Sequence, residues 1–187
     1  MNQNKRLWAS IGVSCLFVGL SAAGVARAAL SGASDAHVSF QASAPAGMKI
    51  EGTTTELAVS DDGGNVVITV PLANLATGIG LRDRHMKEKY LEVQKYPNAV
   101  LTLARSALKV PAGGGQTSAD APGTLLLHGQ ARPVSVHYEA RGDATALDVK
   151  GAFHINMNDY GITVPVYLGV TVKPDVDVTA IFHVTGS

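Results

Sequence analysis

The chain has 187 residues, with 15 basic and 15 acidic side chains and a single cysteine, Cys15. Without residues 1–28, which carry three of the basic side chains and the cysteine, 12 basic and 15 acidic residues remain, a net charge of −3 with neutral His. This net negative charge excludes a protein built to bind a nucleic-acid backbone. Because residues 29–187 contain no cysteine, they form neither disulfides nor cysteine–metal sites.

The N-terminus has the three parts of a secretory signal. Lys5 and Arg6 form the positive start, an apolar run extends from Leu7 to Val25, and Ala26-Arg27-Ala28 is an A-x-A cleavage site. We therefore expect cleavage after Ala28, a periplasmic or secreted location, and no stable membrane span afterwards. The remaining residues 29–187 are long enough for one domain with its own core.

Two alternatives for the N-terminus stay open. The apolar run is long enough to cross a bilayer, so an uncleaved anchor is the first. A lipoprotein anchored at Cys15 is the second, and it is disfavoured because apolar residues continue as Leu16-Phe17-Val18.

Alternation of apolar and polar residues dominates the rest of the chain, and it predicts half-buried antiparallel strands. The alternating runs lie at residues 37–41, 48–51, 66–72, 99–103, 134–139, 149–156 and 176–185. Turn sequences at 61–65 and 141–143 separate some of them, and the Gly-, Ser- and Ala-rich stretch 111–122 is predicted to be a loop.

About eight strands without a second domain predict an all-β fold, an eight-stranded antiparallel barrel, because closure removes the edges of a sheet. A two-sheet sandwich is the alternative. A barrel of this size is either filled by side chains or holds one small ligand, and periodicity does not distinguish the two. The inward positions are Phe40, Ile50, Ile68, Val70, Leu101, Leu103, Val136, Tyr138, Phe153, Ile155 and Phe182.

A dense charged block interrupts the strands and predicts a short amphipathic helix at about 82–93. Met86 and Tyr90 lie four residues apart and Val93 three further on, which gives a narrow apolar stripe. Pro97 follows and ends the helix, since the residue before proline resists the α conformation. We expect Met86 and Tyr90 to face the interior.

The charges of this helix have two interpretations. Asp83 with Lys87 and Arg84 with Glu88 are opposite charges at i and i+4, which would stabilise a solvated helix. Alternatively, the charged face forms a rim or lid over a ligand.

The segment from Thr77 to Pro97 closely resembles the signature of the YceI-like family, T-G-x-x-x-R-D-x-H…Y-L-x-V…[FY]-P. Residues 125–134 resemble its L-x-L-x-G…[KR]-P-V hairpin, and residues 153–162 and 176–184 resemble its C-terminal portion. The resemblance implies a lipocalin-like barrel at 29–187 whose hydrophobic lumen binds a polyisoprenoid or another long-chain amphiphilic lipid. Met157 departs from the family, whose members often carry Arg there, and this leaves one fixed charge fewer.

On this interpretation the ligand-binding residues comprise inward strand positions and the charged helix. The residues expected at the mouth are Arg82, Arg84 and His85, with Tyr90 and Tyr96 as amphipathic lining, and Leu81 and Met86 are further expected ligand-binding residues. The wall is expected to contain Phe40, Ile68, Val70, Leu101, Leu103, Val136, Tyr138, Phe153, Ile155 and Phe182.

No sequence motif predicts catalysis or a cofactor. The chain has no G-x-S-x-G, H-E-x-x-H, C-x-x-C or P-loop pattern, so we expect a protein that is not an enzyme. His137, His154 and His183 could bind a metal if they met across the sheet, but we interpret them as surface residues and expect no metal site.

The competing hypothesis is a non-catalytic stress-related or structural module with a packed core that acts through protein partners. An enzyme acting on an isoprenoid is disfavoured by the lack of an acid–base pair, and a homodimer stays open.

Overall fold

The computed structural model describes residues 29–167 and 170–186. Nine strands form one antiparallel sheet in the spatial order β2-β1-β11-β8-β7-β6-β5-β4-β3. Their bounds are β1 (Leu30–Ser43), β2 (Lys49–Thr54), β3 (Ala58–Asp61), β4 (Asn65–Pro71), β5 (Asn98–Ala104), β6 (Gly115–Leu127), β7 (Gln130–Gly142), β8 (Ala146–Asn156) and β11 (Asp175–Gly186). The expected signal sequence, including Cys15, lies outside the described residues.

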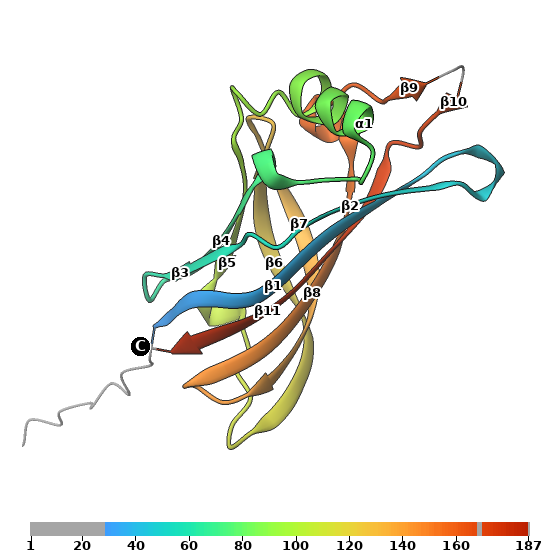
Figure 1. Cartoon of the computed structure of the whole chain (residues 1–187). Helices are drawn as coiled ribbons and strands as arrows, with labels where there is room; N and C mark the ends of the chain where they lie inside the picture. The colour runs from blue at the N-terminus through green and yellow to red at the C-terminus, as the bar shows by residue number, and fades with distance from the viewer. Residues whose placement is uncertain (1–28, 168–169, 187) are drawn as a thin grey trace, which may run out of the picture.

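The remaining elements are short and lie at the ends of the strands. Helix α1 (Gly80–His85) continues into a π-helical turn, η3 (Met86–Tyr90), and strands β9 (Val166–Tyr167) and β10 (Val170–Thr171) form a separate hairpin. Turns of 3₁₀ helix cover Pro45–Gly47, Leu72–Asn74, Arg105–Ala107 and Met157–Tyr160. Figure 1 shows α1 and the β9–β10 hairpin at one end of the sheet and the C-terminus at the other.

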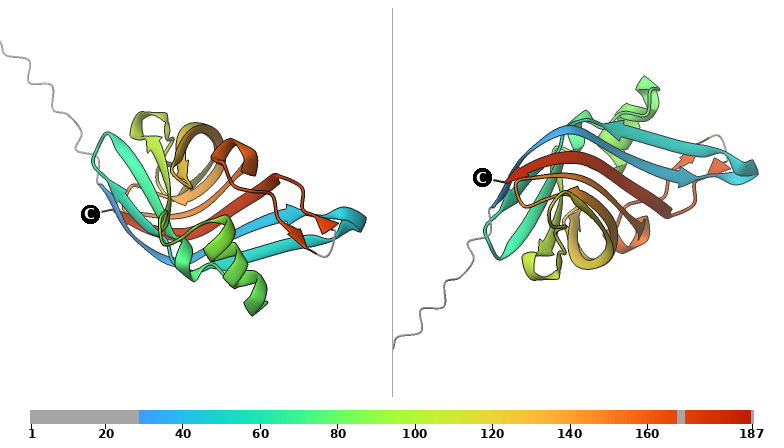
Figure 2. Two further views of the ribbon diagram at one scale, coloured as in Figure 1. Left: turned by 90° about the horizontal axis from the view of Figure 1, so that it is seen from above. Right: turned by 90° about the horizontal axis from the view of Figure 1, so that it is seen from below.

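The sheet curls around its own interior (Figure 2). Bulges between Ser31 and Ala33 and between Ser34 and His37 interrupt the register of β1, and bulges bend a strand. The start of β1 lies beside β3, where the Leu30 amide donates to Asp61 Oδ2 at 3.1 Å. In the described residues no ladder pairs the edge strands β2 and β3 with each other, so a curled nine-stranded sheet stands where eight strands in a closed barrel were expected.

The hairpin of β6 and β7 corrects the loop predicted at 111–122. Strand β6 begins at Gly115 and pairs with β7 as far as its last residue, Leu127. Its inward positions before Pro122 are the small residues Thr117, Ala119 and Ala121, which hide the alternation that larger residues would show. The backbone partner, rather than side-chain propensity, therefore makes this stretch a strand.

One half of the interior is solid. Its buried apolar side chains are Leu30, Val59, Val66, Leu103, Ala121, Val136, Tyr138, Ala140, Leu147, Phe182 and Val184. Arg105 Nη1 lies 3.2 Å from Asp61 Oδ2 in a buried ion pair, and the Tyr138 hydroxyl accepts a hydrogen bond from the Lys109 amide at 2.7 Å. These residues lie at the end of the sheet away from α1, which leaves the other half of the interior for a cavity.

Candidate functional site

A cavity of about 770 Å³ lies between the sheet and the helical segment. Sites for small molecules measure about 300–1,000 Å³, so this one has the volume of a ligand site. The same strand can belong to the cavity wall at one position and to the solid half two residues later. On β5, Leu101 lines the cavity and Leu103 is packed in the solid half; on β11, Ala180 lines the cavity and Phe182 is packed. The interior is therefore half filled and half hollow.

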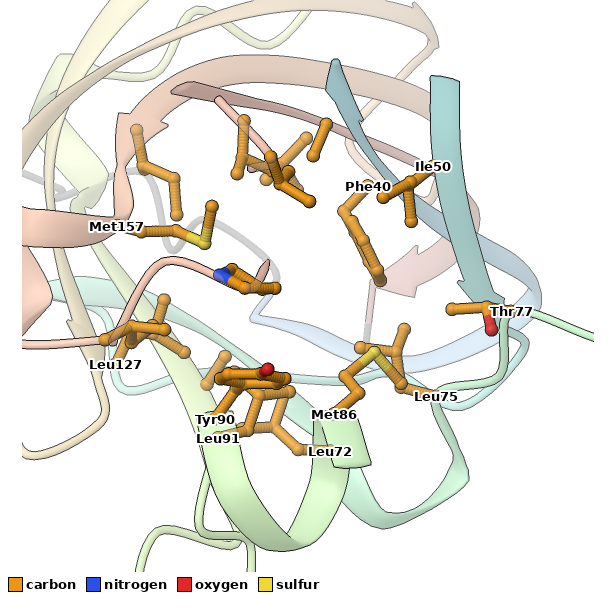
Figure 3. Close-up of a pocket in the computed structure, with 18 of the residues that line it drawn as sticks. Phe40, Ile50, Leu72, Leu75, Thr77, Met86, Tyr90, Leu91, Leu127 and Met157 are labelled. Carbon is orange, nitrogen blue, oxygen red and sulfur yellow. The ribbon is translucent and has the colours of Figure 1, made fainter. Parts of the chain in front are cut away.

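Strand alternation builds most of the wall. Phe40 of β1, Val178 of β11 and Phe153 of β8 lie side by side in register, and all three line the cavity. Ile68 of β4 is paired in register with Leu101 of β5 and extends the apolar surface. Figure 3 shows Phe40 and Ile50 on one side of the cavity, across from Met86, Tyr90 and Leu91.

The helical segment covers the cavity with a different spacing from the one expected. The helix runs over 80–90, and its second part is π-helical: the Leu91 amide donates to the Met86 carbonyl, five residues earlier, at 2.8 Å. This wider turn puts Met86, Tyr90 and Leu91 on the cavity, whereas Val93 packs against the core without lining it. The inward direction of Met86 and Tyr90 matches the prediction. The third residue of the expected apolar stripe was Val93, and in the structure Leu91 takes that place on the cavity.

Two charges of the helix hold the loop before it. The Asp83 carboxylate accepts hydrogen bonds from the Thr77 amide, at 2.7 Å, and from the Thr77 hydroxyl. Arg82 donates from Nε to Thr77 Oγ1 at 2.7 Å and from Nη2 to the Thr77 carbonyl at 2.8 Å. The Thr77 hydroxyl, its amide and the nearby Lys87 and Arg82 cations hold the pKa of Asp83 below its usual value, against a smaller opposing effect of burial.

The expected i,i+4 ion pairs do not form. Within the described part of the chain, Asp83 and Lys87 are not within ion-pair distance, and neither are Arg84 and Glu88. Asp83 turns back to Thr77 instead, and Arg84 is exposed. His85 and Lys89, by contrast, line the cavity.

His128, at the tip of the β6–β7 hairpin, ties the end of the helical segment to the sheet. Its Nε2 lies 2.8 Å from Glu92 Oε2 and its Nδ1 lies 3.0 Å from the Tyr160 carbonyl oxygen. The ring of Tyr96 tilts over the His128 ring, with centroids 4.6 Å apart. Three segments that are distant in sequence thus meet at one imidazole.

The structure places eleven of the seventeen expected ligand-binding residues in the cavity wall. They are Phe40, Ile68, Val70, Leu81, Arg82, His85, Met86, Tyr90, Leu101, Phe153 and Ile155. Their contact with a ligand stays a prediction.

The other six lie elsewhere for three reasons. Leu103, Val136, Tyr138 and Phe182 belong to the packed half, since the strands extend beyond the cavity. Arg84 is exposed outside the wall, and the Tyr96 ring packs at a tilt against His128 instead of entering the cavity.

Sequence reasoning missed a second group of wall residues. They lie in irregular segments and at strand ends: Leu72, Leu75, Leu125, Leu127, Met157, Ile162, Val166 and Val172. The apolar spacing of residues 162–172 was a usable signal, but it follows no uniform period. Met157, the departure from the family pattern, is buried and faces the cavity.

The three histidines considered for a metal lie on the outer face, and each is beside its own carboxylate. His137 Nδ1 lies 2.7 Å from Asp120, His154 Nδ1 lies 2.9 Å from Asp177, and His183 Nδ1 lies 2.8 Å from Asp148. The Asp177 carboxylate raises the pKa of His154, with Asp175 adding to the shift and burial opposing it. In residues 29–167 and 170–186 no group of three potential ligands could hold a metal ion.

No helix among the described residues is long and apolar enough to cross a membrane.

Comparison with known proteins identifies the family of the chain. Residues 31–184 match the YceI-like domain. The chain is 29% identical over 138 residues to a UPF0312 protein of Pseudomonas syringae pv. tomato, covering 69% of this chain and 67% of the relative. A second UPF0312 protein, from Pseudomonas savastanoi pv. phaseolicola, is 29% identical over 124 residues, and the match spans 61% of its length.

Solved structures show the same fold. A polyisoprenoid binding domain from Saccharophagus degradans, implicated in plant cell wall breakdown, superposes with a TM-score of 0.70 at 18% identity, over 86% of this chain and 99% of that one. BcnA of Burkholderia cenocepacia superposes with a TM-score of 0.61 at 18% identity, over 81% and 96%.

Proposed function

Because the chain belongs to the YceI-like family, we propose that it is a binding protein that sequesters a polyisoprenoid or a similar long amphiphile. The observation that carries the proposal is the half-hollow interior, a cavity of about 770 Å³ with a mostly apolar wall. The description of a solved neighbour as a polyisoprenoid binding domain supports the ligand class. A module with a fully packed core, the competing hypothesis, gains no support from such a cavity.

The polar side chains of the wall suggest how the ligand lies. Ser39 comes from β1, whereas Thr77 and the three charged or titratable nitrogen side chains, Arg82, His85 and Lys89, come from the helical segment and the loop before it. The opposite wall is formed by the sheet, where residues such as Phe40 offer apolar contact. We therefore place the polar head beside the helix and the hydrocarbon chain against the sheet, where each buried CH₂ contributes about 0.8 kcal/mol.

Binding without catalysis is part of the proposal. The titratable side chains of the wall are Arg82, His85, Lys89 and Tyr90, and in the described residues no two of them share a hydrogen bond. General acid–base catalysis needs a positioned donor and acceptor within reach of the reacting group. The proposed location is periplasmic or secreted, supported by the signal-like sequence at 1–28.

The test compares a variant that places a Trp side chain in the cavity with one that places the same side chain on the outer face. Val178 lies in register between Phe40 and Phe153 in the wall, and Ile181 of the same strand is exposed on the outer face. Native mass spectrometry and lipid extraction of protein purified from its own host should detect an isoprenoid lipid in the wild type and in I181W. V178W should retain at least about tenfold less. A consistently ligand-free wild type that also rejects added geranylgeraniol would overturn the proposal.

A further inference from the structure

Exposed apolar side chains gather around the mouth of the cavity. Of the large apolar residues that are exposed in the described chain, four also line the cavity: Met48, Ile79, Leu81 and Val166, at 52%, 53%, 45% and 57% exposure. They come from three separate segments: the β1–β2 hairpin, the start of the helical segment and the β9–β10 hairpin. Figure 1 shows α1 and β9–β10 at the same end of the sheet. An apolar patch of this kind around an opening marks an interaction surface.

The same segments carry the opposite charge to the rest of the molecule. Residues 44–50, 77–90, 162–167 and 170–172, here called the rim, contain five basic side chains and two acidic ones. The remainder of residues 29–187 contains seven basic and thirteen acidic side chains. The rim therefore has a net charge of +3 and the remainder −6. One of the two rim acids, Asp83, is hydrogen-bonded to Thr77, while Lys49, Arg84 and Lys89 are exposed.

We propose that the rim docks on the surface of an anionic lipid bilayer with the cavity mouth facing the membrane. Apolar side chains of three segments would enter the region between head groups and acyl chains, and the surrounding cations would contact lipid phosphates, the pattern of interfacial membrane binding. The acidic remainder, repelled by the same surface, would orient the molecule. The purpose of this contact rests on the proposed function: a long hydrocarbon chain dissolved in a bilayer would pass into the cavity without crossing water.

The charge pattern favours a membrane over a second copy of the chain. Two rims facing each other would bring two net charges of +3 together, and like charges at an interface oppose association. An anionic bilayer complements both the charge and the apolar side chains.

The experiment measures vesicle binding separately from ligand binding. Lys49 and Arg84 are exposed rim residues outside the cavity wall, so K49E/R84E reverses two rim charges without touching the lining. R141E/K150E makes the same change at exposed positions on β7 and β8. Full-chain protein processed by its own host is floated with isoprenoid-free vesicles of phosphatidylcholine alone or with about 30% phosphatidylglycerol, and geranylgeraniol retention is measured in parallel by native mass spectrometry.

Wild type and R141E/K150E should bind the phosphatidylglycerol vesicles, more weakly at high salt because salt screens the cations. K49E/R84E should bind them at least about tenfold more weakly while retaining geranylgeraniol normally. Wild-type protein that retains geranylgeraniol but does not bind the vesicles would overturn the docking proposal alone, and vesicle binding without retention would overturn only the proposed function. If K49E/R84E instead abolishes a dimer seen without vesicles, the rim is a self-interface and the docking proposal is wrong.

Discussion

At the scale of single residues, Met157 determines the polarity of one part of the cavity wall. It is buried and faces the cavity, at the position where the family pattern that residues 153–162 resemble has Arg. M157R would place a cation against hydrocarbon, which is unfavourable unless the charge is paired. We expect M157R to lower geranylgeraniol affinity at least about tenfold, by the conversion of about 1.4 kcal/mol per decade.

The control for this prediction is M157L. It conserves volume and should cost less than about 1.5 kcal/mol of stability, with little change in affinity. Equal affinities of M157R and wild type in a native mass spectrometry titration would show that this wall position does not contact the ligand.

The Asp83 carboxylate holds the loop before helix α1 in place through its hydrogen bonds with Thr77. D83N weakens the hydrogen bonds to Thr77 and should cost about 1 kcal/mol of unfolding free energy at pH 7. Because folding lowers the pKa of Asp83, its stabilising effect is present above the unfolded value of 3.8 and is lost as pH falls through the lower folded value. Urea unfolding of wild type and D83N should therefore differ at pH 7 and converge towards pH 2. An equal difference at both pH values would contradict this assignment.

At the scale of elements, the π-helical turn η3 is the feature that the sequence pattern did not predict. The alternation of strands such as β11, and the apolar pair Met86 and Tyr90, could be predicted because each depends on a local period. The inward turn of Leu91 could not, since it depends on one wider hydrogen bond to Met86. Likewise β6 became a strand through its pairing with β7, and small residues leave no periodic signal for that.

The division of the interior into a filled half and a hollow half could not be predicted from the sequence either. Leu101 and Leu103 have the same residue type and face the same interior, yet one lines the cavity and the other is packed. Their difference depends on what stands opposite, which is a property of the whole sheet.

His128 is the contact that holds the end of the helical segment in place. H128A would remove the contacts of His128 with Glu92 and the Tyr160 carbonyl and its tilted ring contact with Tyr96. We expect the amides of Leu91 and Val93 to exchange with solvent at least about tenfold faster in hydrogen-exchange mass spectrometry, since local opening would require less free energy. H37A, at an exposed strand position, is the control and should leave these amides unchanged. If these two amides stayed protected from exchange in H128A, side-chain packing alone would hold the end of the helical segment on the cavity.

At the scale of the whole molecule, the solid half and the hollow half divide stability and binding between them. Phe182 is buried in the packed half, and F182A should cost about 3–5 kcal/mol of unfolding free energy through the lost contacts and the new void. Phe153, on the neighbouring strand, is only partly buried and lines the existing cavity, so F153A removes fewer contacts and should cost less than half as much.

Ligand dependence separates the two halves further. A ligand bound only by the folded protein adds stability by RT ln(1 + [L]/Kd), about 2.7 kcal/mol at a hundredfold excess over Kd. In thermal unfolding with geranylgeraniol, F182A should therefore start from a lower Tm but gain nearly the full wild-type increment, because its cavity wall is intact. F153A should start near the wild-type Tm and gain less, because its Kd is weaker. Equal increments for F153A and wild type, or a lost increment for F182A, would show that the ligand does not occupy the hollow half.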